Sequence, residues 1–264
     1  MNIECFFEMK TMRSGVIFVF CVFFVVGCTV KENREECPCR VVMDFSKVDT
    51  SLVKGVNVLA MSSGGIVFSD YVDVLDFGKE YVREVPHDEM KINVWGGDGA
   101  DEDLTIPYGC ECPDLYMYTF EPDTRGEIWH ESVRLRKNHC CLTVLLEGCD
   151  EIPYSLTFKG NVDGYGYDGL PSEGEFSCVA YPVGTGGSQV VVPRQTDRSL
   201  MMEVDDSEAS VTKMFAIGEY LDSAGYDWDA VDLEDVLVVI DYYLTGFRIT
   251  FKGWDEENYY DIIL

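Results

Sequence analysis

Basic residues are scarce in this sequence, in which 20 lysines and arginines stand against 48 aspartates and glutamates. The formal net charge at pH 7 is therefore −28. A chain of this charge repels phosphate backbones and anionic lipid head groups, so we expect no nucleic-acid partner. The plainest structural role for so many acids is a surface that keeps the protein in solution.

Histidine is rarer still, because the chain has only His87, His130 and His139. No G-x-S-x-G nucleophile elbow accompanies them, and a cysteine nucleophile would need a positioned base that spacing does not reveal. Carboxylate pairs at glycosidase separations arise by chance among 48 acids, so they identify no active site. We therefore predict that the protein is not an enzyme and uses no cofactor and no small-molecule substrate.

Long apolar runs are absent apart from residues 15–27, which include thirteen residues without a charge. A membrane-spanning helix needs ~20 apolar residues, so this run is too short to be one. Basic residues precede the run, and Cys28 follows it directly after a glycine. This order of segments predicts a signal peptide over residues 1–27. Translation could also start at Met9 or Met12, which stand closer to the basic residues.

Residues 25–28, Val-Val-Gly-Cys, resemble the lipobox of bacterial lipoproteins. That resemblance implies a diacylglycerol on the Cys28 sulfur and, after cleavage, a further acyl chain such as palmitate on its amine. Each buried CH₂ contributes roughly 0.8 kcal/mol, so two or more chains anchor a protein stably. Residues 28–36 are rich in charge, which is typical of a flexible leash. The alternative is a secretory signal followed by an incidental cysteine.

Eight further cysteines follow: Cys37, Cys39, Cys110, Cys112, Cys140, Cys141, Cys149 and Cys178. Export permits disulfides, and eight cysteines allow 105 connectivities, so the sequence alone does not assign them. Cys37 and Cys39 form one C-x-C pair, and Cys110 and Cys112 form another. One intervening residue is tight for zinc, whose ligands are usually two to four residues apart. We expect a disulfide between the two pairs, or buried thiols, and no metal.

Strand patterns dominate the chain from residue 40 onward. Val41, Met43 and Phe45 alternate with their neighbours at the period of two that a half-buried strand requires. Similar runs occupy residues 55–61, 66–71, 80–85, 91–95 and 115–120. No segment before residue 210 has a convincing helical period. Several short strands at such spacing indicate an all-β sandwich or barrel.

A second set of strand-like runs begins near Ile128. They cover residues 133–146, 154–159, 175–181, 189–193, 199–204 and 236–243. The glycine-rich stretch 161–174 predicts a loop, residues 211–221 a helix or a strand, and residues 232–235 a helical turn. We place the domain boundary near Glu127, which gives an N-terminal sandwich over residues 37–127 and a C-terminal sandwich over residues 128–264.

The last strand-like run has two different faces. Phe247, Ile249 and Phe251 alternate with polar residues, so one face is expected in the core. The other face consists of Arg248, Thr250 and Lys252, which we interpret as an interaction strand.

Two acidic, glycine-rich loops, residues 98–103 and 163–168, cluster oxygen donors. Neither has the D-x-D-x-D-G spacing with a distal glutamate that calcium loops of the EF type need, so solvated turns are the simpler interpretation. A group of tyrosines could form a sugar-stacking platform or line the edge of a core. They are Tyr165, Tyr167, Tyr259 and Tyr260.

These features together resemble the FimB-type fimbrial anchor lipoproteins of Bacteroides-like bacteria. The resemblance is carried by the lipobox and leash, Cys37-Pro38-Cys39, Trp95-Gly96-Gly97, Val133-Arg134-Leu135-Arg136 and the closing stretch from Gly225 to Trp254. It implies two tandem transthyretin-like β-sandwiches with Greek-key strands in the outer membrane, exposed at the cell surface and anchoring a fimbrial shaft whose length they influence. The implied partner is the shaft subunit, a fimbrillin, bound by β-strand addition. The alternative is a surface glycan-binding lipoprotein of an uptake complex.

Overall fold

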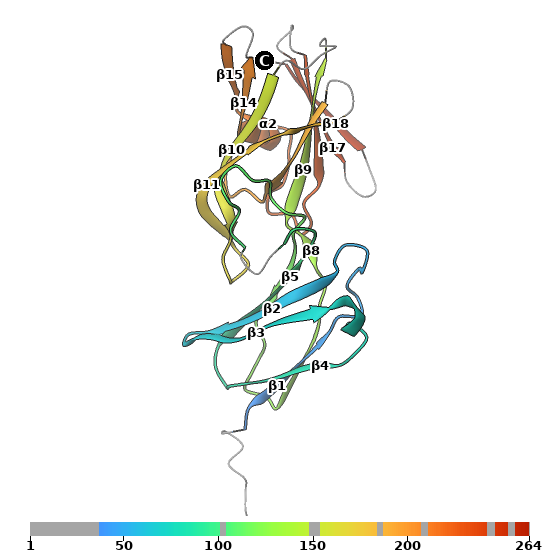
Figure 1. Ribbon diagram of the computed structural model, residues 1–264, viewed down its shortest axis with the longest axis vertical. Helices are drawn as coiled ribbons and strands as arrows, with labels where there is room; N and C mark the ends of the chain where they lie inside the picture. Colours follow the sequence, from blue (N-terminus) through green and yellow to red (C-terminus); the bar gives the residue numbers. More distant parts are fainter. Residues whose placement is uncertain are drawn as a thin grey trace, which may run out of the picture.

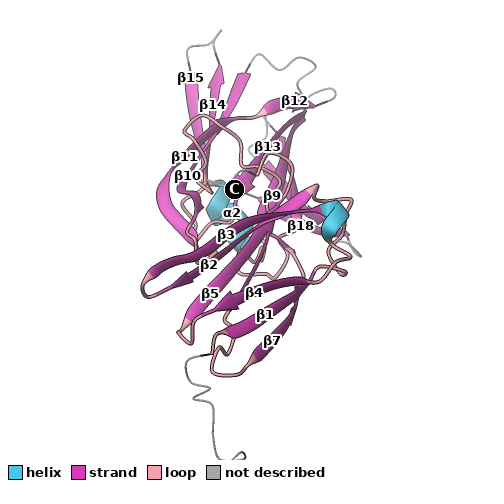
Figure 2. Ribbon diagram, turned by 60° about the horizontal axis from the view of Figure 1, so that its bottom comes forward, coloured by secondary structure: helices cyan, strands magenta, loops and turns pink. Residues whose placement is uncertain are grey.

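The computed structural model describes residues 37–100, 104–147, 154–183, 187–206, 211–241, 246–252 and 257–263. Two groups of strands follow one another along the longest axis of the molecule, and we call them the lower and the upper sandwich after their places in Figure 1. Within the described ranges the helices are short: η2 (Val74–Asp76), a 3-10 turn, and α2 (Ile217–Ser223). Figure 2 shows how little of the molecule they occupy. The all-β prediction is therefore confirmed.

The lower sandwich has two sheets, with strand orders β3-β2-β5-β6-β8 and β4-β1-β7. Its strands are β1 (Cys39–Asp44), β2 (Gly55–Ser62), β3 (Gly65–Asp73), β4 (Tyr81–Val85), β5 (Met90–Gly96), β6 (Tyr116–Phe120), β7 (Ile128–Ser132) and β8 (Arg136–Lys137). Along β1, the buried residues Cys39, Val41 and Met43 alternate with more exposed ones, as the period of two predicts. Phe45 continues this face and stacks on Phe77 with ring centroids 5.4 Å apart. The alternation therefore determines which face of β1 enters the core.

The upper sandwich has sheets with strand orders β11-β10-β14-β15 and β12-β13-β9-β16-β17-β18. Its strands are β9 (His139–Glu147), β10 (Tyr154–Tyr165), β11 (Pro171–Val179), β12 (Tyr181–Val183), β13 (Gly187–Pro193), β14 (Met201–Asp206), β15 (Val211–Phe215), β16 (Asp235–Asp241), β17 (Gly246–Lys252) and β18 (Glu257–Ile263). Inward side chains such as Leu142, Phe158 and Val190 fill one core. Ile217 and Leu221 of α2 are buried in the same core, so the helix covers part of it.

Strand pairing changes from lower to upper partners between Lys137 and His139. β7 pairs with β1 and β8 pairs with β6, whereas β9 pairs with β13 and β16. Our expected boundary near Glu127 assigns residues 128–137 to the second sandwich, but their strands belong to sheets of the first. The reason is packing, because Val133 in this stretch is fully buried in the lower core.

The loop expected over residues 161–174 is shorter than the glycines suggested. β10 continues to Tyr165 and β11 begins at Pro171. Register shifts on both sides of Val162 show that the strand pair accommodates irregular residues as bulges and stays paired. Only the turn between the two strands remains a loop.

Two expectations near the C-terminus have different outcomes. Residues 211–221, expected as a helix or a strand, contain both, because strand β15 is followed by helix α2. The helical turn expected at residues 232–235 is wrong, because no helix forms there. The acidic side chains Asp232 and Asp235 instead bind Lys137, across the junction of the two sandwiches.

Candidate functional site

A segment of the lower sandwich crosses onto the upper one. Residues 104–114, which connect β5 to β6, form this segment, and we call it the strap. The Ile106 N–H donates to the Asp163 carbonyl at 2.6 Å. The Tyr165 N–H donates to the Leu104 carbonyl at 3.1 Å. The strap therefore begins beside β10.

Further along, the strap bridges the gap between the two upper sheets. The Gly109 N–H donates to the Ser177 carbonyl of β11 at 2.8 Å. The Cys112 N–H donates to the Val191 carbonyl of β13 at 3.1 Å. The side chains of Ile106 and Cys112 are buried in the upper core. A piece of the lower half thus closes one side of the upper sandwich.

The turn between β10 and β11 reaches back onto the lower sandwich. Gly169 in this turn has φ +77°, and a Cβ there would lie 2.2 Å from Thr119 Oγ1 and 3.5 Å from Asn93 Oδ1. Glycine is therefore required both by the backbone conformation and by the close approach. Tyr165, just before the turn, shares a buried cluster with Trp95 of β5. Each sandwich therefore contacts the other through one of its own segments: the strap packs on the upper sandwich, and the β10–β11 turn packs on the lower one.

Charged groups also join the two halves. The Lys137 ammonium lies 2.5 Å from Asp235, and the Arg136 guanidinium lies 3.1 Å from Asp232. Asp232 also accepts a hydrogen bond from the Lys137 N–H at 2.9 Å, and the Leu233 N–H donates to the Lys137 carbonyl at 3.1 Å. The side chains of the Arg136 pair are about two-fifths exposed, so the backbone contacts fix this corner more firmly than that pair does.

His139 lies at the same junction and is almost fully buried. Its Nδ1 is 3.1 Å from the Leu115 carbonyl, and the Tyr116 ring meets it edge-on at 5.2 Å. Burial lowers the pKa of His139, and the neighbouring Lys137 charge lowers it further. Asp114 lies 3.5 Å from Nε2 and acts in the opposite direction. The neutral imidazole is therefore the form that fits this place.

Tyr165 belongs to the junction and not to a sugar platform, since its side chain is only 5% exposed. Its hydroxyl accepts a hydrogen bond from the Arg194 N–H at 3.0 Å and donates to the Asn138 carbonyl. Tyr167, by contrast, is 51% exposed. The side chains of Tyr259 and Tyr260 lie outside the described part of the chain.

One open side of the lower sandwich is closed by an ion pair between edge strands of different sheets. Asp70 of β3 is in register with the buried Val58, so it faces inward. Arg83 of β4 is in register with the buried Val41 and also faces inward. The Arg83 Nε lies 2.6 Å from Asp70, which also accepts a hydrogen bond from Tyr81 at 2.7 Å. Inward charges on edge strands hinder pairing with foreign strands.

The opposite side of the lower sandwich has a similar closure at β7. Glu131 accepts hydrogen bonds from the Tyr118 hydroxyl at 2.8 Å and from the Trp129 Nε1–H at 3.1 Å. Burial and this carboxylate raise the pKa of Tyr118 to about 12. Both open sides of the lower sandwich thus carry a charged, hydrogen-bonded group that links its two sheets.

The upper sandwich ends in four other edge strands, β11, β15, β12 and β18. The strap covers β11 at Ser177, and β12 contains Pro182, which has no N–H to donate. β17, which carries the expected interaction residues Arg248, Thr250 and Lys252, is paired with β16 on one side and β18 on the other. Its backbone edges are therefore both in use. Its side chains lie outside the described residues, so their role stays a prediction.

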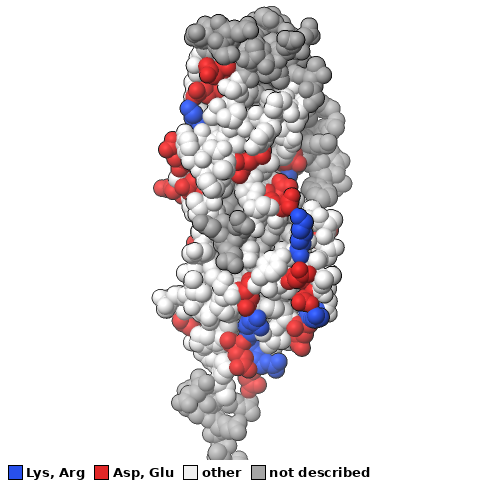
Figure 3. Space-filling view, viewed as in Figure 1, with Lys and Arg blue, Asp and Glu red and all other residues white. Residues whose placement is uncertain are grey.

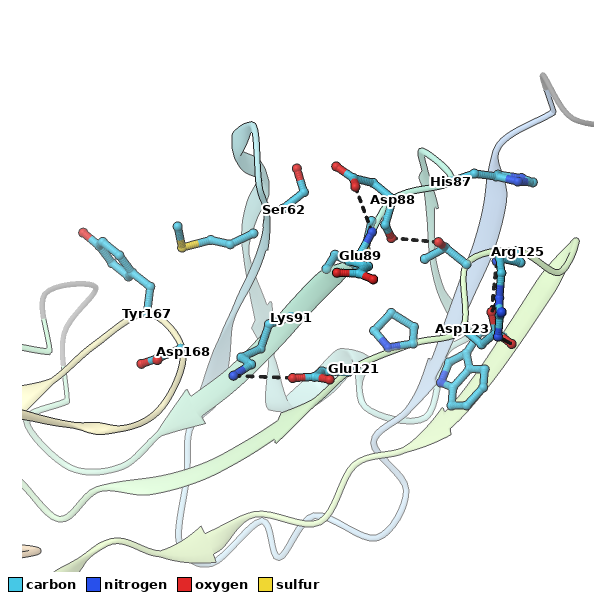
Figure 4. A pocket seen from close by; sticks show the side chains of 15 residues that line it. Ser62, His87, Asp88, Glu89, Lys91, Glu121, Asp123, Arg125, Tyr167 and Asp168 are labelled. Atoms are coloured by element: carbon cyan, nitrogen blue, oxygen red, sulfur yellow. Dashed lines mark hydrogen bonds and ion pairs between the residues drawn. The ribbon is translucent and has the colours of Figure 1, made fainter.

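An open groove of about 990 Å³ lies where loops of the lower sandwich meet the β10–β11 turn (Figure 4). Its carboxylates are Asp88, Glu89, Glu121, Asp123 and Asp168. Lys91 lies 3.5 Å from Glu121, and Arg125 lies 2.8 Å from Asp123. Tyr167 stands at one end of the groove and Arg125 at the other. Hydrogen-bond acceptors beside an exposed aromatic ring suit a hydroxylated ligand.

The structure separates the two C-x-C pairs. Cys39 is buried in the lower core and Cys112 in the upper core. Their neighbours Cys37 and Cys110 are exposed. The expected disulfide between the two pairs does not fit this arrangement. In the described ranges no cluster of three His, Cys, Asp or Glu residues could hold a metal ion.

The acidic loops are hydrogen-bonded turns where they are described. Asp98 pairs with Lys54 at 3.0 Å, and both side chains are largely exposed. Asp168 accepts a hydrogen bond from the Leu170 N–H at 3.1 Å, which tightens the β10–β11 turn. Residues 101–103 lie outside the described chain.

Acidic side chains are spread over the face seen in Figure 3, whereas the basic ones gather mostly over the lower sandwich. None of the helices that the structure describes is long and apolar enough to cross a membrane. The predicted signal peptide and leash, residues 1–36 with Cys28, lie outside the described residues.

Neither a protein-family model nor a curated protein sequence matches the chain. Solved structures do match. A Bacteroides thetaiotaomicron protein provisionally assigned to polysaccharide binding aligns with a TM-score of 0.62 and 13% identity, over 85% of this chain and 98% of its own. A provisional adhesin from the same species gives 0.58 and 14%, over 81% and 96%.

The fimbrial anchor protein Mfa2 from Porphyromonas gingivalis aligns with a TM-score of 0.57 and 13% identity, over 83% of this chain and 98% of its own. Identities this low establish the fold and leave the activity to other arguments. The chain has the two-sandwich fold found in a fimbrial anchor and in adhesin-like proteins of Bacteroides and its relatives.

Proposed function

We propose that this protein is a non-catalytic anchor or assembly subunit of surface fimbriae, held at the outer membrane by lipid on Cys28. Its partner is the fimbrial shaft subunit, whose attachment and length it controls through β-strand contacts. Support comes from the lipobox at residues 25–28 and from the fold shared with a fimbrial anchor protein. The observation that carries the proposal is that β1, the first strand of the chain, and β14 and β15 of the upper sandwich lie at opposite ends of the molecule.

The lower sandwich holds the membrane end in this proposal. β1 lies at the lower end in Figure 1, and Cys37 stands two residues before its first residue, Cys39. Residues 28–36 could span at most ~30 Å when extended, so the lipid would lie close to this end. β14 and β15 lie at the opposite end. Because the lower edges are closed by Asp70 and Glu131, we assign shaft docking to the upper sandwich.

The test compares Cys28→Ser with Cys37→Ser, which removes another cysteine close by in the sequence. Cys28→Ser should leave the outer-membrane fraction or remain an unprocessed precursor, and fimbriae should be shed into the medium. Cys37→Ser should retain both the protein and the attached fimbriae. Co-purification from native outer membranes should recover a fimbrial subunit with the wild type. Membrane retention of an acylated Cys28→Ser, or recovery of no fimbrial subunit, would contradict the proposal.

The groove gives a second candidate function, glycan capture at the surface. The observation that favours it is the exposed Tyr167 beside several carboxylates, together with the polysaccharide assignment of one structural neighbour. Affinity electrophoresis in gels containing starch, xylan or mannan tests it. Tyr167→Ala should abolish retardation, whereas Tyr108→Ala, at another exposed tyrosine that lies outside the groove, should not. If the wild-type protein is not retarded in any of the gels, the glycan-binding hypothesis is contradicted.

A further inference from the structure

Two pairings of Cys112 do not fit the arrangement of the strands. Cys112 bonds to β13 on the side away from β9, which carries Cys140. Two strand spacings, about 10 Å, therefore separate their backbones. Disulfides need Cα atoms within about 7 Å. Cys39 is in the other sandwich, so neither residue is a partner for Cys112.

One pair follows directly after two residues that are joined by a backbone hydrogen bond. Cys110 follows Gly109 in the strap, and Cys178 follows Ser177 in β11. The hydrogen bond from Gly109 to Ser177, 2.8 Å long, holds these two segments side by side. Paired backbones lie about 4.8 Å apart, and disulfides form between Cα atoms about 4.4–6.8 Å apart. Cys110 is exposed, whereas Cys178 is buried on an edge strand, and both are free thiols in the structure.

We propose that Cys110 and Cys178 form a reversible disulfide that fastens the strap to β11. The Cys110 thiolate attacks an incoming disulfide, that of oxidised glutathione or of a protein thiol oxidant, and one thiol leaves. The Cys178 thiolate then attacks the Cys110 sulfur, forms the internal bond and expels the second thiol. Two protein thiols are oxidised, one reagent disulfide is reduced, and the two protons pass to the departing thiolates.

The environment of the two sulfurs sets the order of these steps. Burial, with the nearby Glu111 and Cys110, raises the pKa of Cys178 to about 11. Its thiolate is therefore scarce at neutral pH, and exposed Cys110 meets the oxidant first. Closure by Cys178 limits the rate and accelerates as the pH rises towards that pKa. Oxidation is thus slow and selective.

The bond would act on the contact through which the lower sandwich holds the upper one. Ile106 and Cys112 enter the upper core from the strap, and Gly109 bonds to β11. A cross-link at Cys110 keeps these contacts formed even when the hydrogen bonds open. The redox state would therefore determine how firmly the two sandwiches are joined, whatever partner the protein binds.

The test uses the full chain, purified reduced and then exposed to oxidised glutathione at a series of pH values from neutral to mildly alkaline. Peptide mass mapping without reduction should find glutathione on Cys110 first and then a peptide that joins Cys110 to Cys178. The joined peptide should accumulate faster at higher pH. The oxidised protein should melt several degrees higher than the reduced one, and a reducing agent should reverse the shift.

Cys110→Ser should lose both the joined peptide and the melting shift. Cys37→Ser, which removes an exposed thiol of the lower sandwich, should retain both. A glutathione adduct on Cys110 that never closes at alkaline pH would overturn the proposal, as would a bond from Cys110 to any other cysteine. If Cys110→Ser does not fold, the test rests on the wild-type protein. Equal masses and equal melting temperatures before and after exposure to oxidised glutathione would overturn the proposal.

Discussion

The Asp70 carboxylate and the Arg83 guanidinium meet at 2.6 Å across the open side of the lower sandwich, although they belong to edge strands of different sheets. On the opposite side Glu131 binds Tyr118 of the other sheet at 2.8 Å. The sandwich nearest the predicted lipid therefore has both open sides closed by charged groups. This difference between the two halves is the reason why our proposal assigns docking to the upper sandwich.

Asp70→Ala should destabilise the protein by about 1 kcal/mol, because it leaves the half-buried Arg83 without its partner in a partly solvated site. Thermal melts measure the loss. The control is Asp98→Ala, whose pair with Lys54 is almost fully exposed and should contribute nothing measurable. Equal melting shifts for the two variants would show that the ion pair does not close the sandwich.

The same pair predicts a pH dependence. The hydrogen bond from Arg83 lowers the pKa of Asp70 below the usual value of about 3.9. The ionised carboxylate therefore stabilises the fold above that value, and this stabilisation is lost as the pH falls through the lower, folded pKa. In Asp70→Ala, the free energy of unfolding should lack this part of its decrease with falling pH. If wild type and variant lose stability in parallel below about pH 4, the predicted contribution of Asp70 is contradicted.

Local sequence patterns predicted the strands better than their partners. The alternation of Val41, Met43 and Phe45 fixes which face of β1 is buried, because side-chain direction is a local property. The strap was not anticipated, since its bonds join residues far apart in the chain, and its prolines and glycine resemble an ordinary loop. The one signal was apolar Ile106 and Cys112 within that loop, and only three-dimensional packing shows which core they fill.

His139 should make the stability depend on pH near neutrality. Burial lowers its pKa, so the unfolded chain, with a histidine pKa of about 6.5, takes up a proton first as the pH falls. The free energy of unfolding should therefore decrease from about pH 6.5 downward until the folded pKa is reached. Urea unfolding at several pH values should show a flatter profile for His139→Gln. His130→Gln, at an exposed histidine, is the matched control for the same substitution outside the junction.

Gly169→Ala should weaken the junction by about 2 kcal/mol or more, because the new Cβ meets Thr119 at 2.2 Å and the backbone has φ +77°. Gly225→Ala separates backbone strain from steric contact. The φ angle there is +88°, but no atom lies within 4 Å of the added Cβ. It should cost about 1 kcal/mol from backbone strain alone. Equal losses in chemical denaturation would mean that the β10–β11 turn does not press on the lower sheet.

Ile106→Asp tests whether the strap makes the two sandwiches one cooperative unit. Ile106 is 4% exposed within the upper core, so a carboxylate there should destabilise the protein by several kcal/mol. Ile66→Asp, at a 60% exposed position, should change stability by about 0.5 kcal/mol or less.

Hydrogen exchange should show the effect of Ile106→Asp in both halves. Amides of β9 lose protection because their own core is disrupted. Amides of β1 should lose protection as well, because the strap and the contacts of Lys137 and Tyr165 couple the lower sheets to the upper core. Loss confined to β9 would mean that the sandwiches unfold independently. Under the proposed anchor role, a force between the lipid and the shaft would then separate the two sandwiches, whereas coupled unfolding would make them resist it together.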